Sequence, residues 1–281
     1  MPPLGPEPIW RPIAVPPQAP VREGVAELPG IRLWYWDTGG PNADNSRAVV
    51  LLHAATQSGA GWVYQQPVLA AAGYRVIGYS RRGYYRSDPG DHENPGVAAD
   101  DLYHLLAHLG VVRVDVVAAA HGGFFGLDFA LSYPAQVRSL TIVSSLMGIT
   151  DPDYQAMHAR IRGKFFAGLP HDFQELSPSY RAGNEAGVAA WNALTKQALL
   201  GARIYPKSNH VLTREKLATI AQPTLLLTGD SDLYTPPSVL RMQARHMPHA
   251  ETAVIAEAGH SPYWEQPEAF NARLLDFLAR H

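Results

Sequence analysis

Residues 112–130, VRVDVVAAAHGGFFGLDFA, predict a buried strand, a sharp turn of small residues and a helix in direct succession. Val114, Val116 and Val117 are β-branched and stand in a short segment with little charge, which is typical of a strand buried on both faces of a parallel sheet. Apolar residues then recur at helical spacing from 124 to 131. We therefore expect the turn at the carboxyl end of a central strand, where open α/β sheets bind their ligands.

The turn itself reads Ala-Ala-Ala-His-Gly-Gly over residues 118–123. This segment resembles the nucleophile elbow of the α/β-hydrolase superfamily, whose pattern is small-x-nucleophile-x-small-small. The resemblance implies an α/β-hydrolase fold, with a mostly parallel twisted sheet, helices on both of its faces and a helical cap insertion. Ala120 stands at the nucleophile position, which in the family is usually serine and sometimes cysteine or aspartate.

Alanine carries no nucleophilic atom, so the resemblance implies that this chain is inactive as a nucleophilic hydrolase. Two explanations are open: a serine at position 120 was replaced by alanine, or the nucleophile was lost naturally. We favour the replacement, because the other catalytic motifs are intact and a chain released from chemistry has no physical need to keep them.

The acid and the base of a triad are predicted near the carboxyl terminus. A strand expected over residues 223–229 is followed by the family pattern Gly-x-x-Asp-x-x-x-Pro, which selects Asp232, while Asp230 is interpreted as a turn residue. His260 lies in a loop before the last helix and is expected to be the general base. A serine hydroxyl reacts when an imidazole accepts its proton, and a carboxylate fixes the imidazole tautomer. The order nucleophile, acid, histidine is the α/β-hydrolase order.

An oxyanion hole is expected from two backbone amides. One is the amide of His121, directly after the nucleophile position. The other follows the strand expected over residues 48–52, where Ala55 is our first choice and Ala54 the second. The side chains of His53 and His121 are interpreted as structural or as lining the pocket.

Residues 79–88, YSRRGYYRSD, resemble the family loop Asp-x-Arg-Gly-x-Gly-x-Ser, with Ser80 and Tyr85 as departures. The resemblance implies that this loop braces the active site and that Arg82 is a structural arginine.

The strand–helix alternation breaks after a strand expected over residues 139–144, and this is where the family inserts its cap. We expect a cap over residues 149–211, with helices over 152–168 and 184–200 and a loop over 170–178. Trp62, Phe124 and Trp191 are predicted to line an apolar substrate pocket. The core domain is expected over residues 29–148 and 212–281. Residues 1–28 form a proline-rich extension that is expected to run extended over the surface, to bridge to a second subunit in a homodimer, or to form a flexible tail.

Composition limits the function classes. The 281 residues are 46% hydrophobic, enough for one α/β domain with an insertion. A net charge of −2 and a pI near 6.6 indicate no nucleic-acid partner. The chain has no cysteine, no signal segment and no apolar stretch long enough to span a membrane, so a cytoplasmic protein is expected. No cofactor and no metal site are expected, because the possible pair His104 and His108 lacks a third ligand.

The leading hypothesis is a cofactor-free serine hydrolase that cleaves an ester or lactone of a small hydrophobic or aromatic compound through an acyl-enzyme. A carbon–carbon bond hydrolase of the same superfamily is the second hypothesis. A natural pseudoenzyme that binds a small ligand under the cap is the third, and it comes from a different class.

Overall fold

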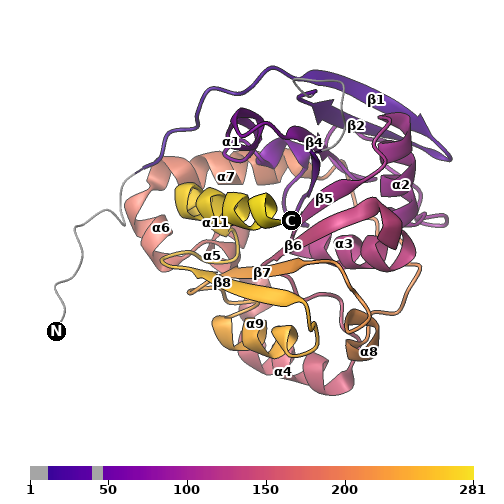
Figure 1. Cartoon of the computed structure of the whole chain (residues 1–281). Helices are drawn as coiled ribbons and strands as arrows, with labels where there is room; N and C mark the ends of the chain where they lie inside the picture. Colours follow the sequence, from indigo (N-terminus) through magenta and orange to yellow (C-terminus); the bar gives the residue numbers. More distant parts are fainter. Residues whose placement is uncertain (1–11, 40–46) are drawn as a thin grey trace.

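A computed structural model of the chain describes residues 12–39 and 47–281. The described strands form one eight-stranded sheet in the order β1-β2-β4-β3-β5-β6-β7-β8 (Figure 1). The strands are β1 (Arg22–Leu28), β2 (Ile31–Asp37), β3 (Ala48–Leu52), β4 (Arg75–Tyr79), β5 (Val114–Ala119), β6 (Val137–Val143), β7 (Thr224–Gly229) and β8 (Ala250–Ile255). The pairs β1–β2 and β2–β4 are antiparallel, and the strands from β4 to β8 pair in parallel. The mostly parallel sheet expected from the sequence is therefore confirmed.

Helices cover both faces of the sheet. The helices are α1 (Gln66–Ala71), α2 (Ala98–His108), α3 (His121–Ser132), α4 (Pro152–Arg162), α5 (His171–Glu175), α6 (Pro178–Gly183), α7 (Glu185–Ala198), α8 (Arg214–Leu217), α9 (Pro237–Ala244), α10 (Pro262–Glu265) and α11 (Pro267–Arg280). In β3, Val50 and Leu52 belong to a core shared with α2 and α3, whereas Val49 and Leu51 belong to a core shared with α1 and α11. Burial on both faces explains the unbroken apolar sequences of the central strands.

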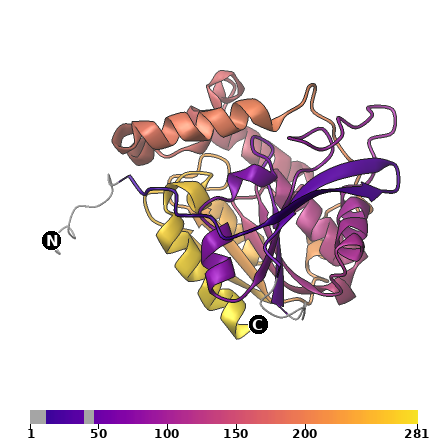
Figure 2. The ribbon, with the colours of Figure 1, turned by 90° about the horizontal axis from the view of Figure 1, so that it is seen from above.

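Helices α4 to α7 lie between β6 and β7 in the chain. Figure 2 shows α7, the long orange helix, at one end of the sheet, outside the layers formed by α2, α3 and α11. The sequence predicted one helix over 152–168, but α4 ends at Arg162, where Gly163 adopts a φ of 63°. The prediction of a loop over 170–178 was wrong in part, because this segment contains α5. Prolines at the two ends of that segment suggested a loop, yet a proline is compatible with the start of a helix, and Pro178 is the first residue of α6.

The amino-terminal boundary predicted at residue 29 also needs correction. Strand β1 begins at Arg22, inside the predicted extension, and pairs with β2 at the edge of the sheet. The reason is that the prolines end at Pro20 and leave the following amide groups free to pair. Before β1, Gln18 donates a hydrogen bond to the Val63 carbonyl (2.8 Å) along the surface. Residues 1–11 of the predicted extension lie outside the described residues.

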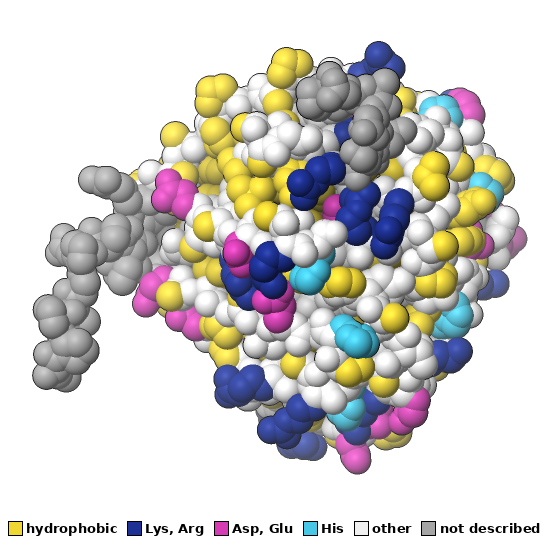
Figure 3. All heavy atoms as spheres, viewed as in Figure 1, with side chains coloured by type: hydrophobic (Ala, Val, Ile, Leu, Met, Phe, Trp, Pro, Cys, Tyr) yellow, Lys and Arg dark blue, Asp and Glu magenta, His cyan; other side chains and the backbone are white. Residues whose placement is uncertain are grey.

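Two surface properties concern possible partners. Within residues 12–39 and 47–281, no helix combines the length and the hydropathy needed to cross a membrane. Figure 3 shows acidic and basic side chains interspersed on one face of the molecule. Neither sign of charge covers that face.

Candidate active site

Ala120 occupies a strained turn between β5 and α3. Its backbone has φ 49° and ψ −113°, a conformation that residues other than glycine rarely adopt. The turn is held on both sides, because the Ala120 amide donates to the Val143 carbonyl (2.8 Å) and the Ser145 hydroxyl donates to the Ala120 carbonyl (2.7 Å). In this geometry the side chain at position 120 faces the cavity described below.

The two glycines after His121 let α3 begin close to the sheet. A Cβ atom at Gly122 would lie 2.6 Å from the Leu52 carbonyl oxygen, and one at Gly123 would lie within van der Waals overlap of the Ser145 side chain. Any larger residue at position 122 would push the start of α3 away from the end of β3. The small-residue frame around position 120 therefore brings the loops after β3 and β5 together.

The strain at position 120 predicts an unusual effect of glycine. The Ala120→Gly variant is expected to raise the free energy of unfolding by about 1 kcal/mol, because relief of an unfavourable backbone conformation outweighs the extra entropy of an unfolded glycine. Chemical denaturation measures the change. The control is Ala130→Gly in α3, where glycine is expected to lower the free energy of unfolding by about 1 kcal/mol. A lower stability for Ala120→Gly would contradict the strain.

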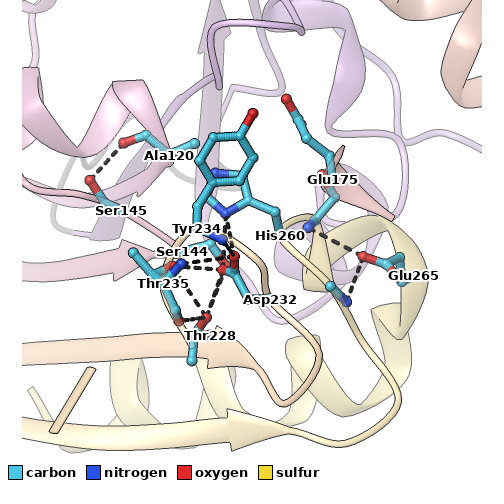
Figure 4. A network of polar contacts seen from close by, with 12 residues as sticks. Ala120, Ser144, Ser145, Glu175, Thr228, Asp232, Tyr234, Thr235, His260 and Glu265 are labelled. Atoms are coloured by element: carbon cyan, nitrogen blue, oxygen red, sulfur yellow. Dashed lines mark hydrogen bonds and ion pairs between the residues drawn. The ribbon is translucent and has the colours of Figure 1, made fainter. Parts of the chain in front are cut away.

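Asp232 and His260 form a buried pair at the ends of β7 and β8. The Nδ1 atom of His260 lies 2.9 Å from each carboxylate oxygen of Asp232, and because a carboxylate only accepts, Nδ1 is the donor. Asp232 also accepts from the hydroxyls of Thr228 (2.8 Å) and Thr235 (2.6 Å) and from the Tyr234 amide (2.7 Å). Figure 4 shows this network converging on the Asp232 carboxylate. Asp230, which was interpreted from the sequence as a turn residue, is exposed and accepts a hydrogen bond from the Ala258 amide.

Asp232 and His260 each stabilise the charged form of the other. Burial alone would raise the pKa of Asp232, but the charge and hydrogen bond of His260 and the Thr235 contacts lower that pKa to about 2. Burial would likewise lower the pKa of His260, yet Asp232 raises it above its usual range, with help from Glu175 and Glu265. Asp232 is therefore ionised at neutral pH and fixes the imidazole with Nε2 free to accept a proton.

A cavity of about 270 Å³ lies at the carboxyl ends of the strands. Its wall contains Ala120, His260, Phe124, Ala55 and His121, together with Thr56, Leu146, His171, Gln174, Glu175, Arg203 and Tyr234. The structure thus brings together the predicted nucleophile position, the predicted base and both residues chosen for the oxyanion amides. Asp232 lies behind His260 and does not reach the cavity wall.

Two of the three predicted pocket residues lie elsewhere. Phe124 lines the cavity, but Trp62 and Trp191 are 2% and 0% exposed and belong to the hydrophobic core. Trp62 packs against Tyr263 with ring centroids 4.7 Å apart. The prediction rested on the position of Trp62 near a motif loop and of Trp191 in the predicted cap, and burial of their large apolar surfaces in the core is more favourable than partial exposure in a pocket.

The amides predicted for an oxyanion hole are available. Within the described part of the chain, neither the Ala55 amide nor the His121 amide donates a hydrogen bond to another residue. The His121 side chain is half-buried, its Nδ1 has no partner among the described residues, and loss of solvation together with Arg81 and Arg203 lowers its pKa to about 3. The His121 imidazole is therefore neutral at pH 7 and does not act as an acid–base partner of His260.

Sequence reasoning missed several residues of the cavity wall. Glu175 comes from α5, and its side chain accepts a hydrogen bond from the Thr56 hydroxyl (3.0 Å) while its peptide carbonyl accepts from the His260 amide (2.7 Å). Burial raises the pKa of Glu175. Arg203 donates to the Ala55 carbonyl (3.3 Å). Neither residue belongs to a motif, and spacing along the insertion does not reveal which side chains turn inward.

The chain is similar to known proteins of one fold family. The family model described as alpha/beta hydrolase fold matches residues 47–179. The chain is 29% identical to the 2-hydroxy-6-oxononadienedioate/2-hydroxy-6-oxononatrienedioate hydrolase of Paraburkholderia xenovorans (strain LB400), covering 92% of this chain and 93% of that protein. It is 28% identical to the "Putative carbamate hydrolase RutD" of Caulobacter sp. (strain K31), over 88% and 96% of the two chains.

A solved structure is similar over most of the chain as well. Est816, described as an N-acyl homoserine lactone degrading enzyme, superposes with a TM-score of 0.72 and 25% identity over 90% of this chain and all of that one. The described residues have the α/β-hydrolase fold, and the family model, the relatives and the solved structures support the α/β-hydrolase superfamily for this chain.

Proposed function

We propose that this chain, with serine at position 120, is a hydrolase that cleaves an ester or lactone of a small hydrophobic or aromatic acid. The observation that carries the proposal is one cavity whose wall contains position 120, His260 with Asp232 bonded behind it, and the two unbonded amides of Ala55 and His121. Its volume of about 270 Å³ fits a small substrate. The likeness to Est816 supports a lactone among the substrates.

The geometry suits the following chemistry. The Nε2 atom of His260 accepts the proton of a serine hydroxyl at position 120 while the hydroxyl oxygen attacks the acyl carbon, and the resulting oxyanion accepts hydrogen bonds from the Ala55 and His121 amides. The imidazolium then gives its proton to the departing alkoxide as the C–O bond breaks and the acyl-enzyme forms. A water molecule repeats the two steps and restores the serine, and Asp232 stabilises the imidazolium in each of them.

The insertion between β6 and β7 contributes side chains to the cavity wall. Helix α5 supplies His171, Gln174 and Glu175 to the cavity wall, and Arg203 follows α7. We propose that the insertion, over residues 149–211, is a cap that selects the substrate. The cavity sides formed by the cap are more polar than the side formed by Phe124 and Leu146, so the cap end would receive the polar part of a substrate.

A second candidate is hydrolysis of a carbon–carbon bond in a vinylogous diketone. The 29% identical relative is named for an oxo-dienedioate substrate, and such substrates carry carboxylates that the guanidinium of Arg203 could receive. A third candidate, from another class, is ligand binding without catalysis. Ala120 itself favours it, because the chain as it stands has no nucleophile at the elbow.

A substrate panel separates these candidates. The Ala120→Ser variant is expected to have its highest kcat/KM on short-chain aryl esters and lactones and at least about tenfold lower kcat/KM on a 2-hydroxy-6-oxo-dienoate, whose loss of absorbance reports carbon–carbon cleavage. The matched control is the same variant with His260→Ala. The reverse order of the two substrate classes would establish the second candidate in place of the first. A folded variant that turns over neither class but binds a small acid would favour the third.

A further inference from the structure

Arg81 is a buried guanidinium without a carboxylate partner. It follows β4, is 3% exposed, and no carboxylate among the described residues lies within ion-pair distance of it. The next residue shows the contrast, because Arg82 pairs with the buried carboxylate of Asp101 at 2.6 Å. Burial lowers the pKa of Arg81, but a guanidinium in a protein remains charged. A buried charge of this kind is unfavourable unless another charge or dipole compensates it.

The Arg81 side chain is directed at backbone carbonyls. Its Nη1 donates to the His53 carbonyl and its Nη2 to the Ala54 carbonyl (3.4 Å). Its Cζ atom lies over the rings of Tyr84 and Phe125, 5.0 Å from each ring centroid. These contacts fix the guanidinium directly behind the loop that follows β3.

The Ala54 carbonyl belongs to the same peptide group as the Ala55 amide in the cavity wall. This carbonyl accepts from His53 Nδ1 (2.8 Å) and from the Gln57 amide (3.3 Å) as well as from Arg81. Hydrogen bonds to a carbonyl polarise the whole peptide group and strengthen its N–H as a donor. The backbone amide of Arg81 in turn donates to His53 Nε2 (3.1 Å), which fixes the neutral imidazole with its proton on Nδ1.

We infer that Arg81 is a positioning residue that polarises the Ala54–Ala55 peptide group and makes this end of the cavity a site for an anionic oxygen. The ligand class is a small carboxylate, or the oxyanion of an acyl-transfer intermediate. The inference deepens the proposed function and rests on it for the oxyanion, but carboxylate binding needs no nucleophile and is a property of the chain with Ala120.

Charges around the cavity have the distribution that such a site requires. Asp232, Glu175 and Glu265 all act on His260 and raise its pKa. Near Arg81, burial and the charge of Arg81 lower the pKa of both His53 and His121, so these imidazoles stay neutral. The ionised carboxylate of Asp232 thus lies behind the imidazole and the charge of Arg81 lies behind the Ala55 amide, which matches a transition state that contains an imidazolium and an oxyanion.

Binding of phenylacetate and of its neutral isostere phenylacetamide to the full chain with Ala120 tests the inference. By calorimetry at pH 7.5, phenylacetate is expected to bind more tightly than phenylacetamide. In Arg81→Gln, which removes the charge and keeps an amide donor, the affinity for phenylacetate is expected to fall about tenfold and the affinity for phenylacetamide to change less than about twofold. Arg203 remains in place in both chains, so the change reports Arg81. Arg81→Lys, which keeps the charge, is expected to restore part of the preference.

Arg82→Gln is the matched control, because it removes a neighbouring buried guanidinium that pairs with Asp101. It is expected to lower the melting temperature but to leave the ratio of the two affinities unchanged. Equal losses for both ligands in Arg81→Gln, or no preference for phenylacetate in the unmodified chain, would overturn the inference. If Arg81→Gln does not fold, a preference unchanged in Arg81→Met or absent in Arg81→Lys would overturn it instead.

The kinetic counterpart uses Ala120→Ser as background. There Arg81→Gln is expected to lower kcat about tenfold and to leave KM for a neutral ester within about twofold, because the charge acts on the oxyanion and not on the ester. An inert Ala120→Ser variant with intact carboxylate selectivity would refute the proposed function alone. An active variant without that selectivity would refute the role of Arg81 alone.

Discussion

The Ala120→Ser variant is expected to hydrolyse p-nitrophenyl esters at least about 10³-fold faster than the unmodified chain, because it restores the group that the Asp232–His260 pair is arranged to activate. The substitution adds one oxygen at a position whose backbone is already held in the strained conformation of the turn. The release of p-nitrophenol at pH 7.5 measures the rate, and an initial burst measures formation of the acyl-enzyme.

The dependence of the rate on pH and the His260→Ala control both follow from the role of His260 as the base. His260 must be neutral to act as a base, and its pKa is raised, so the rate should increase with pH through a midpoint above the usual histidine value of about 6.5. The variant Ala120→Ser with His260→Ala keeps the hydroxyl and removes the base, and it should return to the rate of the unmodified chain. Equal rates with and without His260 would show that the new serine is not activated by this pair.

The second large effect is expected for Asp232→Asn in the Ala120→Ser background, with kcat reduced on the order of 10⁴-fold. An asparagine amide facing Nδ1 favours the imidazole tautomer that carries its proton on Nε2, which then cannot accept the serine proton. Loss of the carboxylate also removes a group that raises the His260 pKa, so the midpoint of the residual pH profile should move to lower pH. Asp230→Asn is the matched control in the same loop, and it should change kcat less than about threefold. A similar loss in both variants would contradict the assignment of Asp232.

The same carboxylate makes stability depend on pH. The folded pKa of Asp232 is about 2, below the value of about 3.9 in an unfolded chain. The contribution of this group to stability is therefore fully present above about pH 4 and is lost as the pH falls toward 2. A shift of this size corresponds to about 2 to 3 kcal/mol. The unfolding free energies of the unmodified chain and of Asp232→Asn should thus converge between about pH 4 and pH 2. Curves that stay parallel would contradict the lowered pKa.

The sequence allowed the framework of the site to be predicted because each part depends on a local pattern. The small residues around Ala120 are required by the close approach of α3 to the end of β3, and the same requirement is visible in the sequence as Gly122 and Gly123. Asp232 follows the buried strand β7 and His260 follows the edge strand β8, and these strands are neighbours in the sheet, which brings their carboxyl ends together. Local spacing and the order of strands were therefore sufficient for these positions.

Other features of the site depend on packing between distant segments. Trp62 stands near a motif loop in the sequence and Trp191 in the predicted cap, but the hydrophobic core surrounds both. Glu175 reaches the cavity because α5 bonds to the His260 loop, although the two segments are far apart in the chain. Arg81 resembles any arginine in a loop until its burial and its two carbonyl partners are known. Such contacts carry no signal in one sequence.

The central claim is that position 120 is a nucleophile position served by His260. Mass spectrometry of the Ala120→Ser variant after treatment with a fluorophosphonate, with and without His260→Ala, tests it most directly. The account predicts one adduct per chain, located on the peptide that contains residue 120 and formed only when His260 is present. A folded Ala120→Ser variant that takes up no label and hydrolyses no ester, or one labelled equally well without His260, would contradict the account.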